Sequence, residues 1–176
     1  MNLKKLYKVF LLLIIIIVNF FMSLDLIRKT ELNDYPLFSL KGFKTHAKLL
    51  ANYDGDTADI FFIYKDIQMR VKARFYGYDC SEMKPSLNDP KREEKKMKAK
   101  MAKKRLWDLC TNNSETEKHE TLIFIDCYDY DKYGRLMVVA YQLPVNENEL
   151  FENSINNQMI EEGHGYSYYG GKKEDF

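Results

Sequence analysis

The sequence lacks the features that mark several functional classes. Only three cysteines occur in 176 residues, and no two of them form a CxxC pair. The three histidines are also far apart, so no ligand spacing typical of a zinc site is present. The net charge is only +1, so attraction to nucleic acid would have to come from a local patch. Internal repeats are absent.

The odd number of cysteines argues against a full disulfide framework. Cys110 and Cys127 could form one bridge in an oxidising compartment, but buried free thiols are the commoner outcome. Aromatic residues reach 14%, which suits either a β-rich core or a surface that stacks nucleobases. The β-rich core is the more frequent reason for such a composition.

One long apolar run is present, at the N-terminus. Residues 9–18 are uninterrupted Val, Phe, Leu and Ile, and three lysines precede them. The run from Leu6 to Met22 has 17 residues, close to the minimum for crossing a bilayer. Residues 1–24 therefore predict an uncleaved signal-anchor, with the N-terminus cytoplasmic and the C-terminal domain translocated.

Two other interpretations of this run remain open. A cleaved signal peptide would make the protein secreted, although Phe20–Met22 offers no small residues before a cleavage point. A buried core helix is the third interpretation. Residues 25–45 mix charges with Pro36 and Gly42 without any period, and we expect them to be a linker.

The remaining chain predicts one domain over residues 46–170 and a tail over 171–176. Asp54-Gly55 and Lys65-Asp66 are turn candidates between apolar segments. Several short strands with a long helix in their middle suit an α+β fold, a five-stranded OB-type barrel with about three helices. We expect strands over 44–53, 58–64, 69–75, 122–128 and 136–141, and helices over 91–110 and 154–162.

The long predicted helix has an unusual surface. Residues 91–105 contain nine lysines and arginines, which either contact nucleic acid or form a solvated face, the latter being the more common case. An approximate apolar stripe would face the barrel. Its members are Met97, Met101, Leu106, Leu109 and Cys110.

Carboxylates and arginines at predicted strand ends carry the chemical signal. Asp56 and Asp79 could together hold a hard cation, and Glu82 could act as a general base on a nearby water. Arg74 and Arg135 could bind phosphate with two parallel hydrogen bonds each. Taken singly, each of these residues is more often an ordinary turn or surface residue.

Together they form three blocks: Asp54-Gly55-Asp56-Thr57; Arg74 with Asp79-Cys80-Ser81-Glu82; and Asp131-Lys132-Tyr133-Gly134-Arg135. In residue identity and in order along the chain, these blocks resemble the signature of the staphylococcal nuclease (thermonuclease) family. The similarity extends over about residues 46 to 170, and residues 159–163 resemble the family's last helix. No position of the signature that we can match is lost.

The resemblance implies a calcium-dependent nuclease acting on DNA or RNA, preferably single-stranded, as a monomer. It assigns Asp56, Asp79 and the main-chain oxygen of Cys80 to calcium, and Glu82 to the general base. Arg74 and Arg135 would bind the scissile phosphate. The residues expected near the terminal phosphate and nucleotide are Lys132, Tyr133 and either Tyr168 or Tyr169.

Three departures from the family pattern stand out. Cys80 replaces a threonine, Ser81 replaces a proline, and the spacing from Asp56 to Arg74 is longer than usual. The alternative from another class is a membrane-anchored module that binds nucleic acid or a protein without cleaving it. Asn112-Asn113-Ser114 is a glycosylation sequon that would matter only in a translocated domain.

Overall fold

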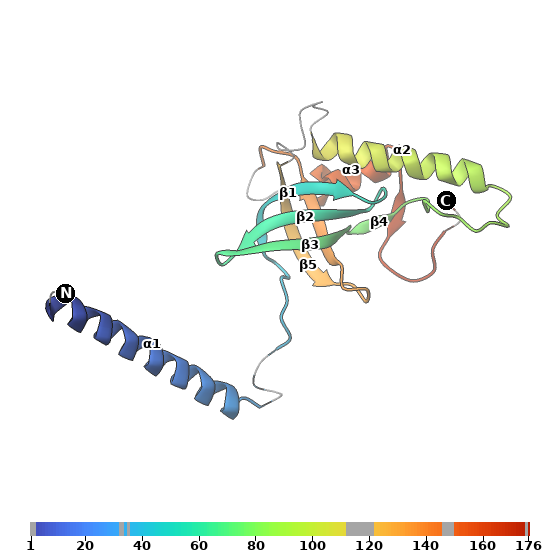
Figure 1. Ribbon diagram of the computed structural model, residues 1–176. Helices are drawn as coiled ribbons and strands as arrows, with labels where there is room; N and C mark the ends of the chain where they lie inside the picture. Colours follow the sequence, from blue (N-terminus) through green and yellow to red (C-terminus); the bar gives the residue numbers. More distant parts are fainter. Residues whose placement is uncertain (1–2, 32–33, 35, 112–121, 146–149, 175) are drawn as a thin grey trace. The chain divides into compact units, whose positions relative to one another are not determined.

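The computed structural model describes residues 3–31, 34, 36–111, 122–145, 150–174 and 176. The chain divides into two compact units, residues 1–38 and 39–176 (Figure 1). The first unit contains helix α1 (Leu3–Lys29). The second contains β1 (Lys44–Asn52), β2 (Thr57–Tyr64), β3 (Ile67–Phe75), β4 (Gly77–Asp79), α2 (Arg92–Cys110), β5 (Leu122–Tyr130), β6 (Leu136–Tyr141), the 3-10 helix η1 (Phe151–Asn153), α3 (Ile155–Glu161) and β7 (Tyr166–Tyr168).

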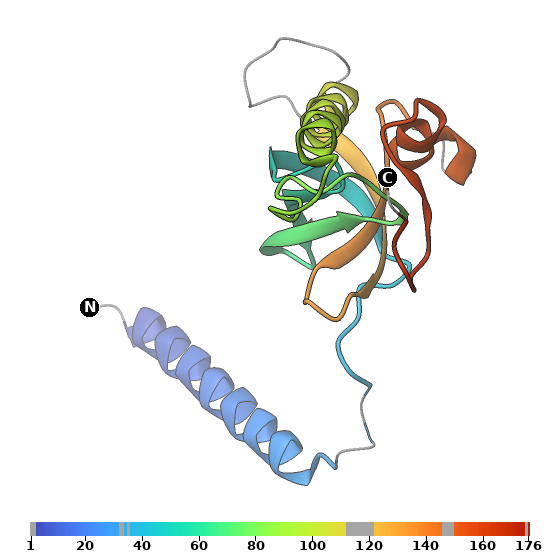
Figure 2. The ribbon, with the colours of Figure 1, turned by 90° about the vertical axis from the view of Figure 1, so that its right-hand side faces the viewer.

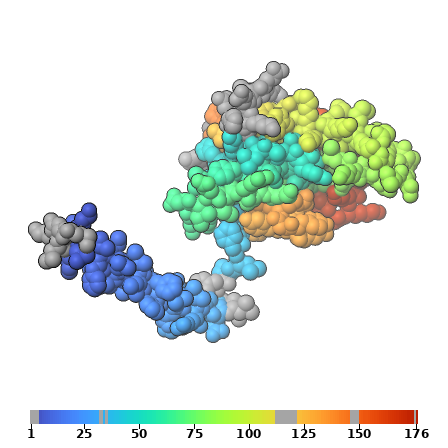
Figure 3. All heavy atoms as spheres, in the orientation of Figure 1, coloured from blue at the N-terminus to red at the C-terminus, as the bar shows by residue number. Residues whose placement is uncertain are grey.

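Helix α1 is longer than the apolar run that predicted it. Its segment Lys5–Lys29 has 25 residues and a mean hydropathy of 2.7, which is long and apolar enough to cross a membrane. None of that segment is buried, and its side chains are exposed along the helix (Figure 3). Helix α1 belongs to the first unit, and the barrel belongs to the second. A membrane span and a signal sequence both fit its length and composition.

The second unit is built on a closed barrel with strand order β1-β2-β3-β6-β5. β5 pairs with β1 to close it, and every pair is antiparallel except β3 with β6, which is parallel. This is the topology of the OB-type barrel, so the predicted fold is confirmed. Figure 2 shows α2 and α3 on the barrel, and β4 with β7 forms a separate two-stranded sheet.

The barrel core follows from the alternation of apolar residues along the strands. Ile60, Ile125 and Val138 come from three different strands and are fully buried. Since successive strand side chains point to opposite faces, Asp59 beside Ile60 and Asp126 beside Ile125 point away from the core and are partly exposed. The turn predicted at Lys65-Asp66 is present, and both residues have positive φ (46° and 65°), as a tight two-residue hairpin requires.

The apolar stripe predicted for α2 is wrong at two positions. Met97 and Met101 are 60% and 54% exposed, whereas Ala99 and Ala102 face the barrel and are buried. The reason is a close approach. A Cβ on Gly55 would lie 2.6 Å from the Ala102 Cβ, so only small residues fit between the helix and the β1–β2 loop.

The compact unit begins before the predicted domain start at residue 46. Leu40 is buried in the core, and the Gly42 amide donates to the Cys127 carbonyl at 2.8 Å. Residues 44 and 45 already belong to β1. The segment predicted as a linker over 25–45 thus contains the C-terminal end of α1, up to Lys29, and the first two residues of β1.

All three cysteines are buried free thiols, so Cys110 and Cys127 do not pair. The sequon at Asn112-Asn113-Ser114 lies outside the described residues.

Candidate active site

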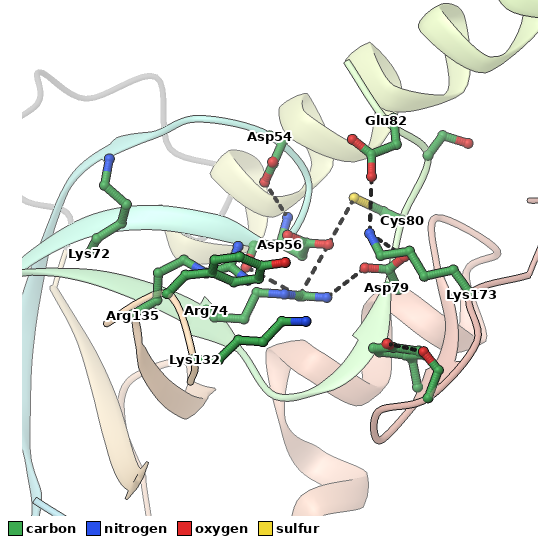
Figure 4. Close-up of a pocket in the computed structure, with 14 residues that line it drawn as sticks. Asp54, Asp56, Lys72, Arg74, Asp79, Cys80, Glu82, Lys132, Arg135 and Lys173 are labelled. Carbon is green, nitrogen blue, oxygen red and sulfur yellow. Dashed lines mark hydrogen bonds and ion pairs between the residues drawn. The ribbon is translucent and has the colours of Figure 1, made fainter. Parts of the chain in front are cut away.

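One pocket of about 590 Å³ gathers the three sequence blocks (Figure 4). Of the ten predicted site residues, only Tyr169 is not part of its wall. The adjoining pocket of about 350 Å³ contains Tyr169 and shares Arg74, Lys132, Tyr133, Arg135 and Tyr168 with the first. The wall of the larger pocket includes Asp54, Asp56, Lys72, Arg74, Asp79, Cys80, Ser81, Glu82, Lys132, Tyr133, Arg135, Tyr168 and Lys173.

Strand pairing explains why these distant residues meet. Thr57 at the start of β2 pairs with Arg74 near the end of β3, which places Asp56 beside Arg74. Arg74 also pairs in parallel with Met137 of β6, which brings the β5–β6 turn with Arg135 alongside. Asp79 at the end of β4 pairs with Tyr166 of β7. The pairing of β2 with β3, of β3 with β6 and of β4 with β7 therefore assembles the site.

The loop before β2 is fixed by its own side chains. The Asp54 carboxylate accepts the amides of Asp56 (3.1 Å) and Thr57 (2.7 Å), a local turn that aspartate favours. The buried Tyr78 hydroxyl donates to the Gly55 carbonyl at 2.6 Å. Both contacts hold the main chain around Asp56.

Arg74 lies at the centre of the site and is buried, unlike Arg70 and Lys72 on the same strand face. Its guanidinium contacts Asp56 Oδ2 at 3.1 Å and Asp79 Oδ1 at 2.7 Å (Figure 4). It also donates to the Tyr78 carbonyl at 2.8 Å. Arg74 thus links the two aspartates predicted to bind metal, a contact that the sequence did not suggest.

The surroundings of Asp56 disfavour the charged form of its carboxyl group. Burial raises the pKa of its carboxyl to about 7, Arg74 opposes that shift, and the nearby Asp54 and Asp79 add to it. The Cys80 thiol lies 3.4 Å from Asp56 Oδ2 as a donor, and burial raises the pKa of this thiol well above its usual range. The neutral Cys80 thiol therefore donates a hydrogen bond to a carboxylate whose negative charge the neighbouring cations only partly balance.

The β5–β6 turn presents Arg135 in a fixed orientation. Asp131 accepts the amides of Tyr133 and Arg135, both at 2.9 Å, and binds the Arg135 guanidinium at 2.7 Å. Burial would raise the pKa of Asp131, but these hydrogen bonds lower it. Arg135 also donates to the Thr57 hydroxyl at 3.3 Å, which ties the turn to the block containing Asp56.

Lys132 and Tyr133 lie at the tip of this turn. The Lys132 ammonium is 5.0 Å from the Tyr133 ring centre, and Tyr133 is 71% exposed. Tyr169 is 65% exposed and lines the adjoining pocket. Tyr168 contributes to both pockets, and its hydroxyl donates to the Gly171 carbonyl at 2.9 Å. Tyr133 and Tyr168 therefore line the same two pockets as Arg74 and Arg135.

Glu82 has a partner that the sequence did not predict. Its carboxylate contacts the Lys173 ammonium at 3.0 Å, and the same ammonium lies 3.2 Å from Asp79 Oδ2. The Tyr166 hydroxyl donates to Asp79 Oδ2 at 3.1 Å. Lys173 belongs to the segment predicted as a tail, and nothing in its local sequence distinguishes it from Lys172. Only the return of the chain after β7 reveals its position.

The donors suit a hard cation in type but are few. Asp56 and Asp79 supply carboxylate oxygens around one guanidinium, and the raised pKa of Asp56 marks a place where added positive charge would be favourable. Among the described residues, no three His, Cys, Asp or Glu side chains form a metal-binding group. Calcium accepts carboxylate, main-chain and water oxygens in loose geometry, so this donor set fits calcium if water completes it.

The cationic surface of α2 is mostly neutralised. Six of its lysines and arginines have carboxylate partners within 4 Å, including the Arg105–Glu162 pair that joins α2 to α3. Most of the cations of α2 are therefore balanced by carboxylates of the protein itself. The six are Arg92, Lys95, Lys96, Lys98, Lys104 and Arg105.

Comparison with known proteins adds no assignment to this geometry. A scan against protein-family models and a search of curated proteins found no match to the chain.

Proposed function

We propose that the barrel unit is a calcium-dependent nuclease that hydrolyses phosphodiester bonds of DNA, RNA or both. One observation carries the proposal: a single pocket contains carboxylates from two blocks and cations from two blocks, in the order that resembles the staphylococcal nuclease family. Phosphodiester hydrolysis needs ligands for a cation, a base for water and positive charge for the phosphate. The pocket wall offers all three.

Each group has a distinct role in this proposal. Asp56, Asp79 and the Cys80 main-chain oxygen would hold calcium, which when bound supplies positive charge to the phosphate and lowers the pKa of water. Glu82 takes the proton from the attacking water. Arg135, held by Asp131 and Thr57, points further N–H groups at a phosphate oxygen.

Arg74 has a second task. Because Arg74 contacts both aspartates, it balances their negative charge in the absence of calcium. Once calcium neutralises the aspartates, Arg74 can donate hydrogen bonds to the phosphate instead. Lys132 binds a terminal phosphate by charge. The exposed faces of Tyr133 and Tyr169 suit stacking of unpaired bases, which favours single-stranded or flexible substrates.

Helix α1 supports delivery to or through a membrane. We propose that the domain is either anchored by this helix or secreted after its removal, on the non-cytoplasmic side in both cases. The lysines before the apolar run favour a cytoplasmic N-terminus. Calcium is abundant outside the cytoplasm, which fits the proposed chemistry.

A second candidate is a module that binds nucleic acid or a protein without cleaving it. It is favoured by one observation: Arg74, Asp79 and Glu82 all have charged partners within the protein. A site whose charges are already paired holds a stable fold without doing chemistry. The same pairing also fits a nuclease that is held inactive.

The test uses the full chain in mild detergent on single-stranded DNA and RNA, with calcium or with EGTA. We expect calcium-dependent cleavage, and a loss of about 10²–10⁴ in turnover for Glu82→Gln with oligonucleotide and calcium binding retained. Glu152→Gln is the matched control, because Glu152 is exposed and lies outside both pockets.

Other outcomes would reassign the protein. Near-normal turnover of Glu82→Gln would remove Glu82 from the base role. A folded chain that binds oligonucleotide but never cleaves would support the binding module. No binding of single-stranded oligonucleotide at low salt would support a protein-interaction barrel.

A further inference from the structure

The chain after β7 turns back toward the pocket, where Lys173 lines the wall and donates to Glu82 Oε1 at 3.0 Å. Gly170 and Gly171 both have positive φ (110° and 99°), a conformation that glycine adopts at no steric cost. The paired glycines reverse the chain direction immediately after Tyr169. We refer to Gly170–Glu174 together with Phe176 as the C-terminal strap.

Lys173 is the point at which the strap meets the chemistry. Its ammonium lies 3.0 Å from Glu82 Oε1 and 3.2 Å from Asp79 Oδ2, as the dashed lines of Figure 4 show. Burial would lower the pKa of Lys173, but the hydrogen bond to Glu82 and the charge of Asp79 raise it. The side chain is therefore a permanent cation bound to two carboxylates of the site.

Contacts beyond Lys173 hold the strap in place. Ser81 Oγ donates to the Phe176 main-chain oxygen at 2.9 Å, and the Phe176 ring lies 5.4 Å from the Tyr166 ring. The Lys98 ammonium is 5.1 Å from the Phe176 ring centre. The Glu174 amide donates to the Tyr166 hydroxyl at 3.0 Å. These contacts involve α2, β7 and the loop after β4, so the strap is a packed element.

We propose that the C-terminal strap is an autoinhibitory device, in which Lys173 binds Asp79 and Glu82 until a divalent cation at Asp79 displaces it. The proposal rests on the proposed function, because it gives these two carboxylates the roles of metal ligand and general base. While Lys173 is bound, Glu82 is paired with an ammonium and Asp79 is shared between Lys173 and Arg74.

The energetic consequence is a lowered apparent affinity for calcium. When only a fraction of the molecules has an open site, the apparent dissociation constant rises in inverse proportion to that fraction. Coupling of this kind typically changes an affinity by 5–150-fold. Releasing the strap should therefore tighten calcium binding by about tenfold.

The experiment measures calcium binding by isothermal titration calorimetry on the full chain in detergent, without nucleic acid. Lys173→Met should bind calcium about tenfold more tightly, and Lys173→Arg, which keeps the charge, should resemble the original protein. Lys172→Met is the control for the removal of one nearby positive charge. Because Lys173 is half exposed, Lys173→Met should fold normally.

Phe176→Ala separates a strap from a local charge effect. This variant changes no charge but removes the ring that anchors the strap, and it should tighten calcium binding in the same direction. Trypsin cleavage after Lys172 and Lys173 should be slow without calcium and at least several-fold faster with it. A shift in Lys173→Met without a shift in Phe176→Ala would overturn the strap, and so would the absence of calcium binding in every variant.

The experiments can contradict the proposed strap and the proposed nuclease activity independently of each other. Tighter calcium binding in both variants, with no cleavage of any oligonucleotide, would retain the strap and remove the nuclease. Calcium-dependent cleavage with identical calcium affinity in all variants would retain the nuclease and remove the strap.

Discussion

Arg74 connects two carboxylates whose negative charge would otherwise lie unbalanced inside the protein. Truncating one partner of such a buried group leaves charge without compensation, which is strongly destabilising. The stability of this site therefore depends on how much positive charge lies near its carboxylates. Arg74 offsets the charge of Asp56 and Asp79, and Lys173 offsets that of Asp79 and Glu82.

Asp56 should give the domain an unusual dependence on pH. Because burial raises its pKa from 3.8 to about 7, the folded state binds a proton between these values that the unfolded state releases. This group therefore lowers the free energy of unfolding as the pH rises from about 4 to 7, and the loss persists above 7. In calcium-free buffer we expect the difference between the original protein and Asp56→Asn to change by up to about 4 kcal/mol over that range.

Urea unfolding at several pH values measures this difference. Carboxyls with a lowered pKa, such as Asp131 and Glu162, act in the opposite direction but are present in both proteins. Their effects cancel in the comparison. Parallel stability curves for the two proteins would show that Asp56 does not titrate abnormally.

At the scale of elements, α2 shows what side-chain size does at a close contact. Ala102 lies against Gly55, where even one extra carbon would approach to 2.6 Å. Ala102→Leu should lower stability by about 1–3 kcal/mol through overpacking, and it should disturb the loop that carries Asp56. Met101→Leu is the matched control, since Met101 is exposed, and should change stability by less than about 0.5 kcal/mol.

The shift in urea midpoint measures both variants. An equal effect of the two substitutions would mean that α2 faces the barrel with the stripe predicted from its sequence, rather than with its alanines.

The strands and the barrel were predictable because their signal is local. The alternation from Met69 to Phe75 and the turn at Lys65-Asp66 each depend on a few neighbouring residues, and the motif blocks lie at strand ends where the pairing gathers them. Which face of α2 packs on the barrel was not predictable, because alanine is only weakly hydrophobic. The close approach of Gly55 to Ala102 is a tertiary contact, which local sequence does not encode. The position of Lys173 depends on how the strap returns, which no local pattern encodes.

At the scale of the whole molecule, the start of the folded unit can be tested directly. A fragment of residues 39–176 keeps Leu40 and the Gly42–Cys127 hydrogen bond, whereas one of residues 46–176 loses both and the first two residues of β1. We expect the shorter fragment to be less stable by about 3 kcal/mol or more. Equal urea midpoints for the two fragments would place the domain start at 46.

The parallel contact of β3 with β6 has a consequence for timing. It consists of the pairs Ala73–Leu136, Arg74–Met137 and Phe75–Val138, and it joins segments about sixty residues apart along the chain. Contacts of such long range form late, because the entropy of closing the intervening loop opposes them. All residues of the site are thus synthesised before folding brings them together. If the domain is a nuclease, it remains harmless to the nucleic acids around it until folding is complete.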